Sequence, residues 1–218
     1  MIKFENTEVY GWEAAIRGMR NPMNSWDKSD SDWEFVEDES IINPNDEVLF
    51  VAGENDLRLM KNLSKAGNDH GKFLRYINVT VDITAPLYWW KEFDTYKVGT
   101  VANSCSTMHK IHAKEFTCDD FSIEHLNDAS MLRMKDLIYQ LNAERKLFLE
   151  TGDKSHWWQM IQLLPSSYNQ RRTVQLNYQV LKSMYHARKH HKLDEWRIGF
   201  CEWCDTLPYF KEICLEVE

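Results

Sequence analysis

The sequence predicts a mixed α+β fold, because it contains both of the periodicities that distinguish strands from helices. Residues 74–84 and 170–176 alternate between apolar and polar side chains, which is typical of half-buried strands. Several longer segments carry apolar residues at the spacing of an amphipathic helix. The apolar face of the first strand consists of Ile77, Val79, Val81 and Ile83.

The N-terminal part is expected to open with a strand end and a helix between Val9 and Met19. Residues 20–47 are polar and acidic, and we expect a long irregular excursion there, of the kind that is often functional. A helix then begins near Glu54 and ends at Gly67. After the first alternating strand, Pro86 can occupy the first turn of the next helix.

The middle of the chain contains an uncharged run of small residues from Gly99 to Met108. Its small side chains would let a ligand approach the backbone, although a plain polar loop is the more usual reading. Asn127 is predicted to cap a long helix that extends to about Glu150. Another helix should cover residues 156–164.

The C-terminal part begins with the second alternating strand. Asn177 can then cap a helix from Tyr178 to Arg188. The apolar spacing of residues 193–207 predicts a last major helix, with Trp196, Phe200 and Trp203 inward.

Size and charge restrict the class of protein. A length of 218 residues suits one domain, covering 1–218, with a full hydrophobic core. No apolar run approaches the roughly 20 residues of a membrane span, and the N-terminus lacks the apolar core of a secretory signal, so we expect a cytoplasmic protein with no membrane partner. The net charge of −8 argues against general DNA or RNA binding, since phosphate contacts need broad positive potential.

The stretch from Lys154 to Lys192 has no Asp or Glu, although the chain as a whole is acidic. A local excess of cations is typical of a site for an anion, and a solvated basic face is the alternative. Around Arg171 and Arg172 the cations alternate with apolar and amide residues, which indicates that part of the stretch is packed. Packed arginines need a partner, which is either an internal acid or a ligand.

The cysteines and histidines do not predict a metal site. Five cysteines in a chain expected to be cytosolic argue against a disulfide framework. Cys201 and Cys204 have CxxC spacing, but without a second pair nearby the apolar face of a helix is the better interpretation. His186 and His190 could share a helix face, yet no third ligand stands at suitable spacing.

Three collinear blocks of the sequence resemble the flavin-dependent thymidylate synthases, the ThyX family. The resemblance covers most of the chain and implies a ThyX-like fold, a mainly antiparallel twisted sheet flanked by helices. The blocks are Val9 to Met19; Leu59 to Gly67 with Val79 to Leu87; and Leu164-Pro165, Arg171, Asn177, Leu181, Arg188, His190, His191 and Trp196.

The family's signature R-H-R-x-x-S-x-N-E-x-S-x-R corresponds here to Tyr96 to Met108. Aligned on Asn103, this segment keeps the signature's Asn and, at Ser106, its second Ser. Tyr-Lys-Val stands where Arg-His-Arg would be, and the segment contains no arginine. In the family these arginines bind the nucleotide phosphate and the flavin, and a lysine such as Lys97 does not reproduce the bidentate contacts of a guanidinium.

The resemblance implies dUMP methylation by a methyltransferase that uses methylenetetrahydrofolate, NADPH and bound FAD, in a homotetramer with sites built between subunits. Two alternatives remain open: a non-catalytic protein that binds a nucleotide or related phosphorylated molecule on this scaffold, and an oligomeric interaction protein. The residues that the resemblance assigns are Ser106 for catalysis, Asn177, His191 and Asn103 for the cofactor, and Arg188, Arg171 and Lys97 for the substrate.

Overall fold

The computed structural model describes residues 2–35 and 48–216, which form two compact units. Unit 1 contains residues 2–7, 80–175 and 189–200. Unit 2 contains the described residues of 8–79, together with 176–188 and 201–216. The expectation of a single domain stays a prediction.

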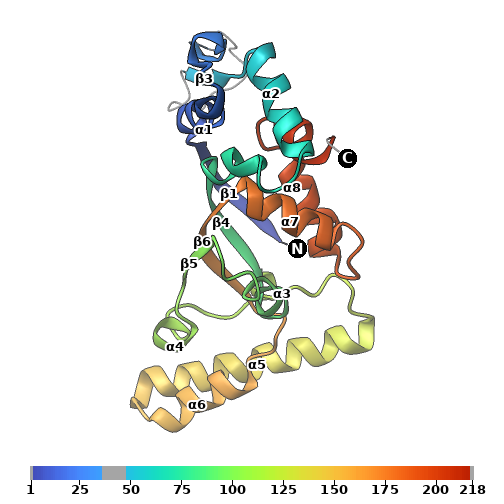
Figure 1. The fold of residues 1–218 in the computed structure, drawn as a ribbon. Coiled ribbons are helices and arrows are strands. Elements are labelled where there is room, and N and C mark those ends of the chain that lie inside the picture. The colour runs from blue at the N-terminus through green and yellow to red at the C-terminus, as the bar shows by residue number, and fades with distance from the viewer. Residues whose placement is uncertain (1, 36–47, 217–218) are drawn as a thin grey trace. The chain divides into compact units, whose positions relative to one another are not determined.

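A four-stranded antiparallel sheet with the order β1-β4-β6-β5 is the main β structure (Figure 1). The two strands predicted from alternation are both present, as β4 and β6, and residues 77, 79, 81 and 83 are buried. Strand β5 pairs with β6, with Val101 opposite Gln175 and Ser104 opposite Arg172. The strands are β1 (Lys3–Tyr10), β4 (Asn78–Pro86), β5 (Val101–Ser104) and β6 (Asn169–Asn177).

Unit 1 contains most of this sheet together with several helices. Asn127 caps α5 as predicted, because its side-chain oxygen accepts a hydrogen bond from the backbone N–H of Ser130. Trp89 and Trp196 stack at 4.4 Å in the core, and Trp90 is also buried. The helices are α3 (Leu87–Phe93), α4 (Thr107–Lys110), η4 (Cys118–Asp120), α5 (Asp128–Thr151), α6 (Lys154–Leu163) and the π-helical turn η5 (Glu195–Phe200).

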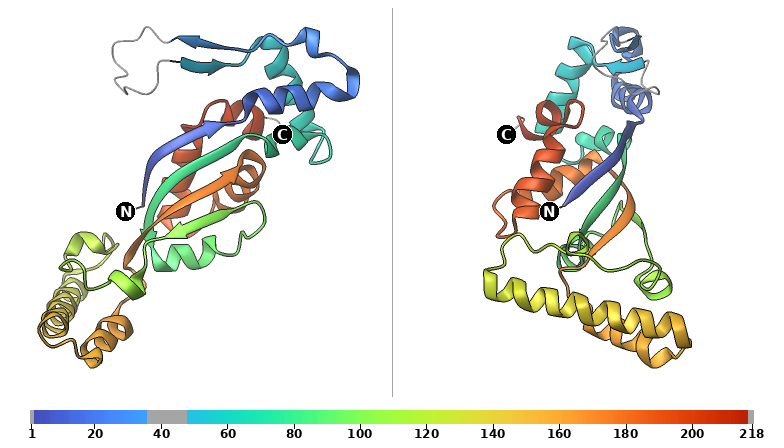
Figure 2. Two further views of the ribbon diagram at one scale, coloured as in Figure 1. Left: turned by 90° about the vertical axis from the view of Figure 1, so that its left-hand side faces the viewer. Right: turned by 180° about the vertical axis from the view of Figure 1, so that it is seen from behind.

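Helices α5 and α6 form a hairpin whose core lies within unit 1 (Figure 2). Met134 and Leu141 of α5 and Met160 of α6 are buried together with Phe116 and Phe121. Gly152 ends α5 in the left-handed conformation, with φ of 69°, and Asp153 caps α6, which explains the sharp reversal between them.

Unit 2 is helical apart from strand ends and a two-stranded antiparallel sheet of β2 and β3. Trp12 is buried against Phe50 and Tyr178, at ring distances of 5.0 and 5.6 Å. The elements are α1 (Trp12–Arg20), η1 (Asn21–Met23), η2 (Trp26–Lys28), β2 (Asp32–Phe35), β3 (Val48–Val51), α2 (Glu54–Lys65), η3 (Gly71–Arg75), α7 (Tyr178–Arg188), α8 (Cys201–Asp205) and η6 (Lys211–Leu215).

Gly11 makes the change from β1 to α1 possible. Its φ is +96°, and a Cβ at this position would lie 2.0 Å from the backbone oxygen of Tyr76. Any other residue would therefore suffer both an unfavourable backbone conformation and a clash with main chain.

Three expectations about local structure are wrong in part. The run from Gly99 to Met108 is not simply a loop, because β5 lies within it; both faces of this edge strand are exposed, so it lacks an alternating pattern. The excursion at 20–47 contains η1, η2 and β2, and its residues 36–47 lie outside the described part. The helix expected over 193–207 is present over 195–205, but its first part, η5, is π-helical and continues directly into α8.

Candidate functional site

Arg171 of β6 is bound by two carboxylates from two other strands of the sheet in unit 1. Its guanidinium donates to Asp82 of β4 at 2.8 Å and to Glu5 of β1 at 3.2 Å. Asp82 also accepts hydrogen bonds from Thr173 and Asn6. These contacts, first that of Thr173 and then that of Arg171, lower the pKa of Asp82 to about 2.

Arg172, the next cation of β6, is held in a similar way. It donates to Asp94 at 2.7 Å and to the side chain of Gln170 at 3.0 Å. Its guanidinium carbon also lies 4.2 Å from the centre of the Trp90 ring, a distance at which a cation–π contact is favourable. The partners of both arginines are therefore acidic side chains of the same chain, and Arg172 also contacts an aromatic ring.

Histidines of the acid-free stretch also have acidic partners within unit 1. His191 lies 3.1 Å from a carboxylate oxygen of Glu92, and its Nδ1 accepts a hydrogen bond from the backbone N–H of Leu193. His156 lies 2.7 Å from Glu144. The absence of acids in the sequence segment is thus compensated by acids from elsewhere in the chain.

Three candidate site residues lie on the exposed surface of unit 1 around β5. Ser106 caps α4, since its Oγ accepts a hydrogen bond from the backbone N–H of His109 at 3.0 Å. Asn103 lies on β5 opposite Thr173. Lys97 is exposed between α3 and β5. The structure gives Ser106 a capping role, and the described contacts supply no base for its hydroxyl.

Asn177 and Arg188 lie at opposite ends of α7 in unit 2. The Asn177 Oδ1 accepts a hydrogen bond from the backbone N–H of Val180 at 3.1 Å, which confirms the predicted cap. Arg188 is half-buried in the last turn, where a cation is favoured by the helix dipole. The ligand contacts assigned to these two residues stay predictions.

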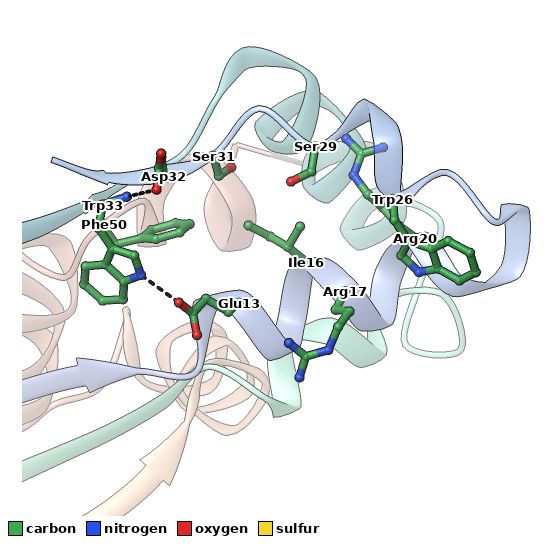
Figure 3. A pocket seen from close by; sticks show the side chains of 10 residues that line it. All are labelled: Glu13, Ile16, Arg17, Arg20, Trp26, Ser29, Ser31, Asp32, Trp33 and Phe50. Carbon is green, nitrogen blue, oxygen red and sulfur yellow. Dashed lines mark hydrogen bonds between the residues drawn. The ribbon is translucent and has the colours of Figure 1, made fainter.

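The sequence did not reveal a cavity of about 240 Å³ in unit 2, between α1 and the segment that leads into β2 (Figure 3). Trp26 and Trp33 stand at opposite ends of it, and Ile16 and Phe50 give it an apolar wall. The indole N–H of Trp33 donates to Glu13 at 2.9 Å, which fixes that ring. The sequence feature that could have indicated this cavity is the presence of Trp26 and Trp33 in an otherwise polar stretch.

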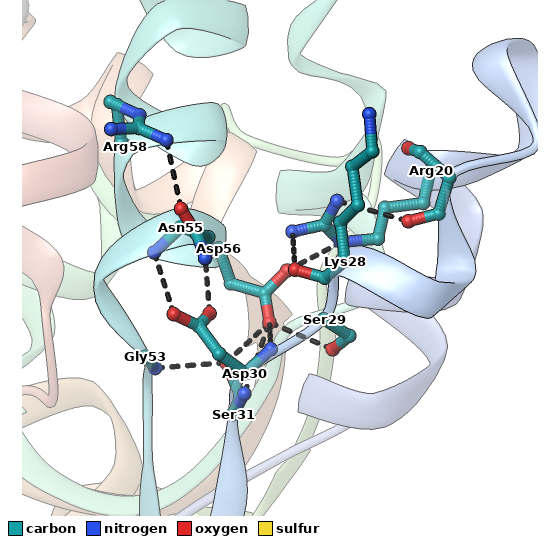
Figure 4. A network of polar contacts seen from close by, with 10 residues as sticks. Arg20, Lys28, Ser29, Asp30, Ser31, Gly53, Asn55, Asp56 and Arg58 are labelled. Carbon is teal, nitrogen blue, oxygen red and sulfur yellow. Dashed lines mark hydrogen bonds and ion pairs between the residues drawn. The ribbon is translucent and has the colours of Figure 1, made fainter.

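Above this cavity, a polar network joins residues 25–31 to α2 (Figure 4). The buried pair at its centre is Arg20 and Asp56, with Nε and Oδ1 2.7 Å apart. Arg20 also donates to the backbone oxygens of Ser25 and Lys28. The buried polar atoms of this network are paired with one another, so the network stabilises unit 2.

The first turn of α2 is capped from another part of this network. Gly53 at the N-cap position has no side chain, and the Asp30 carboxylate accepts hydrogen bonds from the backbone N–H groups of Asn55 and Asp56 instead. A carboxylate at this end of a helix is favoured by the exposed N–H groups and by the dipole.

Within the part of the chain that the structure describes, no three His, Cys, Asp or Glu side chains stand together in a way that could hold a metal ion. Cys201 and Cys204 are buried on α8, as expected for the apolar face of a helix. Burial raises the pKa of the Cys204 thiol, which disfavours the thiolate. In residues 2–35 and 48–216, no helix has the length and apolar character needed to cross a membrane.

Comparison with known proteins gives a clear result for the fold. No protein-family model matches the sequence, and no curated protein matches it significantly. A structure of thymidylate synthase X from Helicobacter pylori with FAD and dUMP is 15% identical, with a TM-score of 0.65 over 99% of this chain and 97% of that chain. A second structure, of the flavin-dependent thymidylate synthase ThyX from the same organism complexed with FAD and dUMP, is 16% identical, with a TM-score of 0.65 over 99% and 98% of the two chains.

The chain has the ThyX fold. The predicted fold class and the resemblance are therefore confirmed, since the match extends over nearly the whole of both chains. At this identity the likeness concerns the fold, and the roles of individual residues need their own evidence.

Proposed function

We propose that this protein binds a nucleoside monophosphate of the dUMP class on its ThyX fold, without flavin-dependent methylation. The observation that carries the proposal is the match over nearly the whole chain to two structures that contain dUMP and FAD. A shared scaffold of this extent supports retention of a binding role. The residues present decide how much of the chemistry accompanies it.

The residues of this chain do not fit FAD. A flavin dinucleotide carries a diphosphate, whose charge is best held by guanidinium groups or clustered backbone N–H groups. The segment from Tyr96 to Met108 has no arginine. The two arginines of β6 are bound by Asp82, Glu5 and Asp94. Recruiting them to a phosphate would leave those carboxylates unpaired, so no step of a reaction is assigned to a flavin here.

A single phosphate needs fewer cationic partners than the diphosphate of FAD. We assign the phosphate of the nucleoside monophosphate to Arg188. This residue belongs to the block of sequence that resembles the family's substrate-binding segment, and it is half-buried at the end of α7. The resemblance assigned Asn177 and His191 to the cofactor, and that assignment stays a prediction. Two carboxylates already neutralise the charge of Arg171, so a phosphate would have to displace them to bind there.

Thermal unfolding in the presence of nucleotides tests this proposal. A ligand at 100 times its dissociation constant should raise the free energy of unfolding by about 2.7 kcal/mol. We expect such a gain with dUMP, and we expect Arg188→Ala to abolish it. Lys192→Ala is the matched control, since Lys192 is an exposed cation of the same acid-free stretch.

Two results would count against the proposal. A gain that survives Arg188→Ala unchanged would place the phosphate elsewhere. A preparation that takes up FAD and absorbs at about 450 nm would instead support the flavin-dependent enzyme that the resemblance implied.

A further inference from the structure

The cavity between α1 and the segment that leads into β2 has a half-exposed indole at each end, and we name it the Trp26–Trp33 cavity (Figure 3). The side chains of Trp26 and Trp33 are 50% and 43% exposed, whereas Trp89 and Trp196 in the core of unit 1 are 0% exposed. Aromatic side chains around a hollow are typical of a site that receives another apolar group.

Most of the lining comes from a part of the chain that the ThyX resemblance does not include. The first resembling block ends at Met19 and the next begins at Leu59, while both tryptophans and Phe50 lie between them. None of the residues assigned to catalysis, the cofactor or the substrate is among the described residues that line this cavity. The cavity is therefore separate from the nucleotide site proposed above.

The polar groups on one side of the cavity already have hydrogen bonds inside the chain. The hydroxyls of Ser29 and Ser31 both donate to the buried carboxylate of Asp56, at 2.8 and 2.7 Å. Arg20 donates to the same carboxylate at 2.7 Å. A ligand could engage these groups only by breaking the network of Figure 4, so its polar contacts have to come from α1 and β2.

Glu13 of α1 supplies a carboxylate beside the aromatic end of the cavity (Figure 3). Its Oε1 accepts a hydrogen bond from the indole N–H of Trp33 at 2.9 Å, and within the described part of the chain no residue donates to its Oε2. The rings of Trp33 and Phe50 meet at 5.5 Å and 73°, which forms an aromatic corner. Asp32, whose Oδ1 accepts from the backbone N–H of Trp33, adds a second negative charge at this end. A spare carboxylate oxygen next to aromatic rings is the combination that recognises an organic ammonium group.

Two cations among the described lining residues do not reverse this charge. Arg20 is neutralised by Asp56, with Nε and Oδ1 2.7 Å apart. Arg17 is exposed, and its guanidinium points away from Ser29, on the opposite side of α1 (Figure 3). The charge that remains beside the Trp33 ring is therefore negative, which favours a cationic ligand over an anionic one.

We propose that the Trp26–Trp33 cavity binds a small aromatic amine in its protonated form. The ammonium group pairs with Glu13 beside Trp33, and the ring packs on Ile16 between the two indoles. Size sets the upper limit of the ligand. A cavity of about 150 Å³ is known to hold one benzene ring, so the 240 Å³ available here suits a bicyclic ring with a short side chain.

Nuclear magnetic resonance of the nine indole N–H groups of the full chain tests this proposal. The probes are tryptamine, indole-3-ethanol and indole-3-acetate, which share one ring system and differ in charge, each titrated to about 10 mM. We expect tryptamine to shift the signals of Trp26 and Trp33, assigned by replacing each with Phe, and to leave the signal of the buried Trp89 in place. Indole-3-ethanol should bind at least about fivefold more weakly than tryptamine, and indole-3-acetate more weakly still.

Two variants separate the charge from the aromatic surface. Glu13→Gln keeps an oxygen that accepts from Trp33 but removes the charge, so it should weaken tryptamine about fivefold and leave indole-3-ethanol within about twofold. Trp26→Ala removes one aromatic end and should weaken both probes. The matched controls are Glu8→Gln, an exposed carboxylate of β1, and Trp158→Ala, a 44% exposed tryptophan of α6, and both should bind like the wild type.

Three results would overturn the proposal. Tryptamine that shifts neither Trp26 nor Trp33 would show that the cavity is not its site. Equal affinity for tryptamine and indole-3-ethanol, or undiminished binding of tryptamine by Glu13→Gln, would remove the role of charge. Tighter binding of indole-3-acetate that is lost in Arg17→Gln would make the cavity an anion site. Far-UV circular dichroism and the melting temperature of each variant verify that unit 2 remains folded.

Discussion

Replacing Asp56 by Asn should destabilise unit 2 strongly, because it breaks the buried pair at the centre of the network in Figure 4. Asp56 is 0% exposed and Arg20 is 4% exposed. One carboxylate oxygen receives Arg20, and the other accepts hydrogen bonds from the side chains of Ser29 and Ser31 and from the backbone N–H groups of Asp30 and Ser31. In the Asp56→Asn variant, an NH2 group in place of this second oxygen would face only hydrogen-bond donors.

The expected magnitude follows from this burial. Removing one partner of a buried ion pair costs roughly 3–5 kcal/mol, since the other charge remains without compensation. For a chain of this length, that loss lowers the melting temperature by roughly 6–20 °C. The contacts also set a pH dependence: burial alone would raise the pKa of Asp56, but hydrogen bonds from Ser31, Ser29 and Arg20 outweigh it and lower the pKa. The stabilisation is therefore present above the carboxyl's unfolded pKa and is lost as the pH falls below it.

Urea unfolding followed by circular dichroism measures this loss, with Asp69→Asn as the matched control on an exposed carboxylate of unit 2. Equal m-values with a lower midpoint would identify a change in stability. A double variant, Arg20→Met with Asp56→Asn, should cost less than the sum of the single changes, because no charge then remains buried. If Asp56→Asn stays within about 0.5 kcal/mol of the wild type, the contact between Arg20 and Asp56 does not exist in solution.

Three further predictions concern the sheet, the first helix and the substrate assignment. The low pKa of Asp82, about 2, means that its stabilising contribution is present above pH ~4 and is lost as the pH falls toward 2; acid titration of Asp82→Asn should show a shallower loss of stability in that window, and an unchanged slope would contradict the assignment. Gly11→Ala should cost at least about 2 kcal/mol, because its Cβ would meet Tyr76, and a neutral effect in thermal unfolding would show that the turn differs. Arg171→Ala should lower the melting temperature yet change nucleotide affinity, measured by calorimetry, less than about threefold; a larger loss of affinity would restore Arg171 as a substrate ligand.

Much of the fold could be predicted because its elements carry local signals. Strand β4 alternates cleanly, and Asn127 and Asn177 cap α5 and α7 as their residue types suggest. Strand β5 was missed because an edge strand with both faces exposed has no hydrophobic alternation. The helix over 195–205 was predicted, but the π-helical character of its first part, η5, was not, because the buried aromatic residues keep helical spacing throughout.

The candidate site was less accessible to sequence reasoning, and the arginines of β6 show why. Their excess of charge was visible in the sequence, but the neutralising carboxylates are far away along it: Asp94 is 78 positions from Arg172, Asp82 is 89 positions from Arg171, and Glu5 is 166 positions away from Arg171. Only the order of strands in the sheet brings them together. A segment of sequence that contains no acidic residues can therefore still be surrounded by acidic side chains in the folded chain.

Calorimetric titration of the purified chain with dUMP and then with FAD distinguishes binding of a nucleoside monophosphate from flavin-dependent chemistry. We expect saturable heat with dUMP that Arg188→Ala removes, and no saturable heat with FAD. Stoichiometric uptake of FAD, with a yellow protein that methylates dUMP when folate and NADPH are supplied, would contradict it.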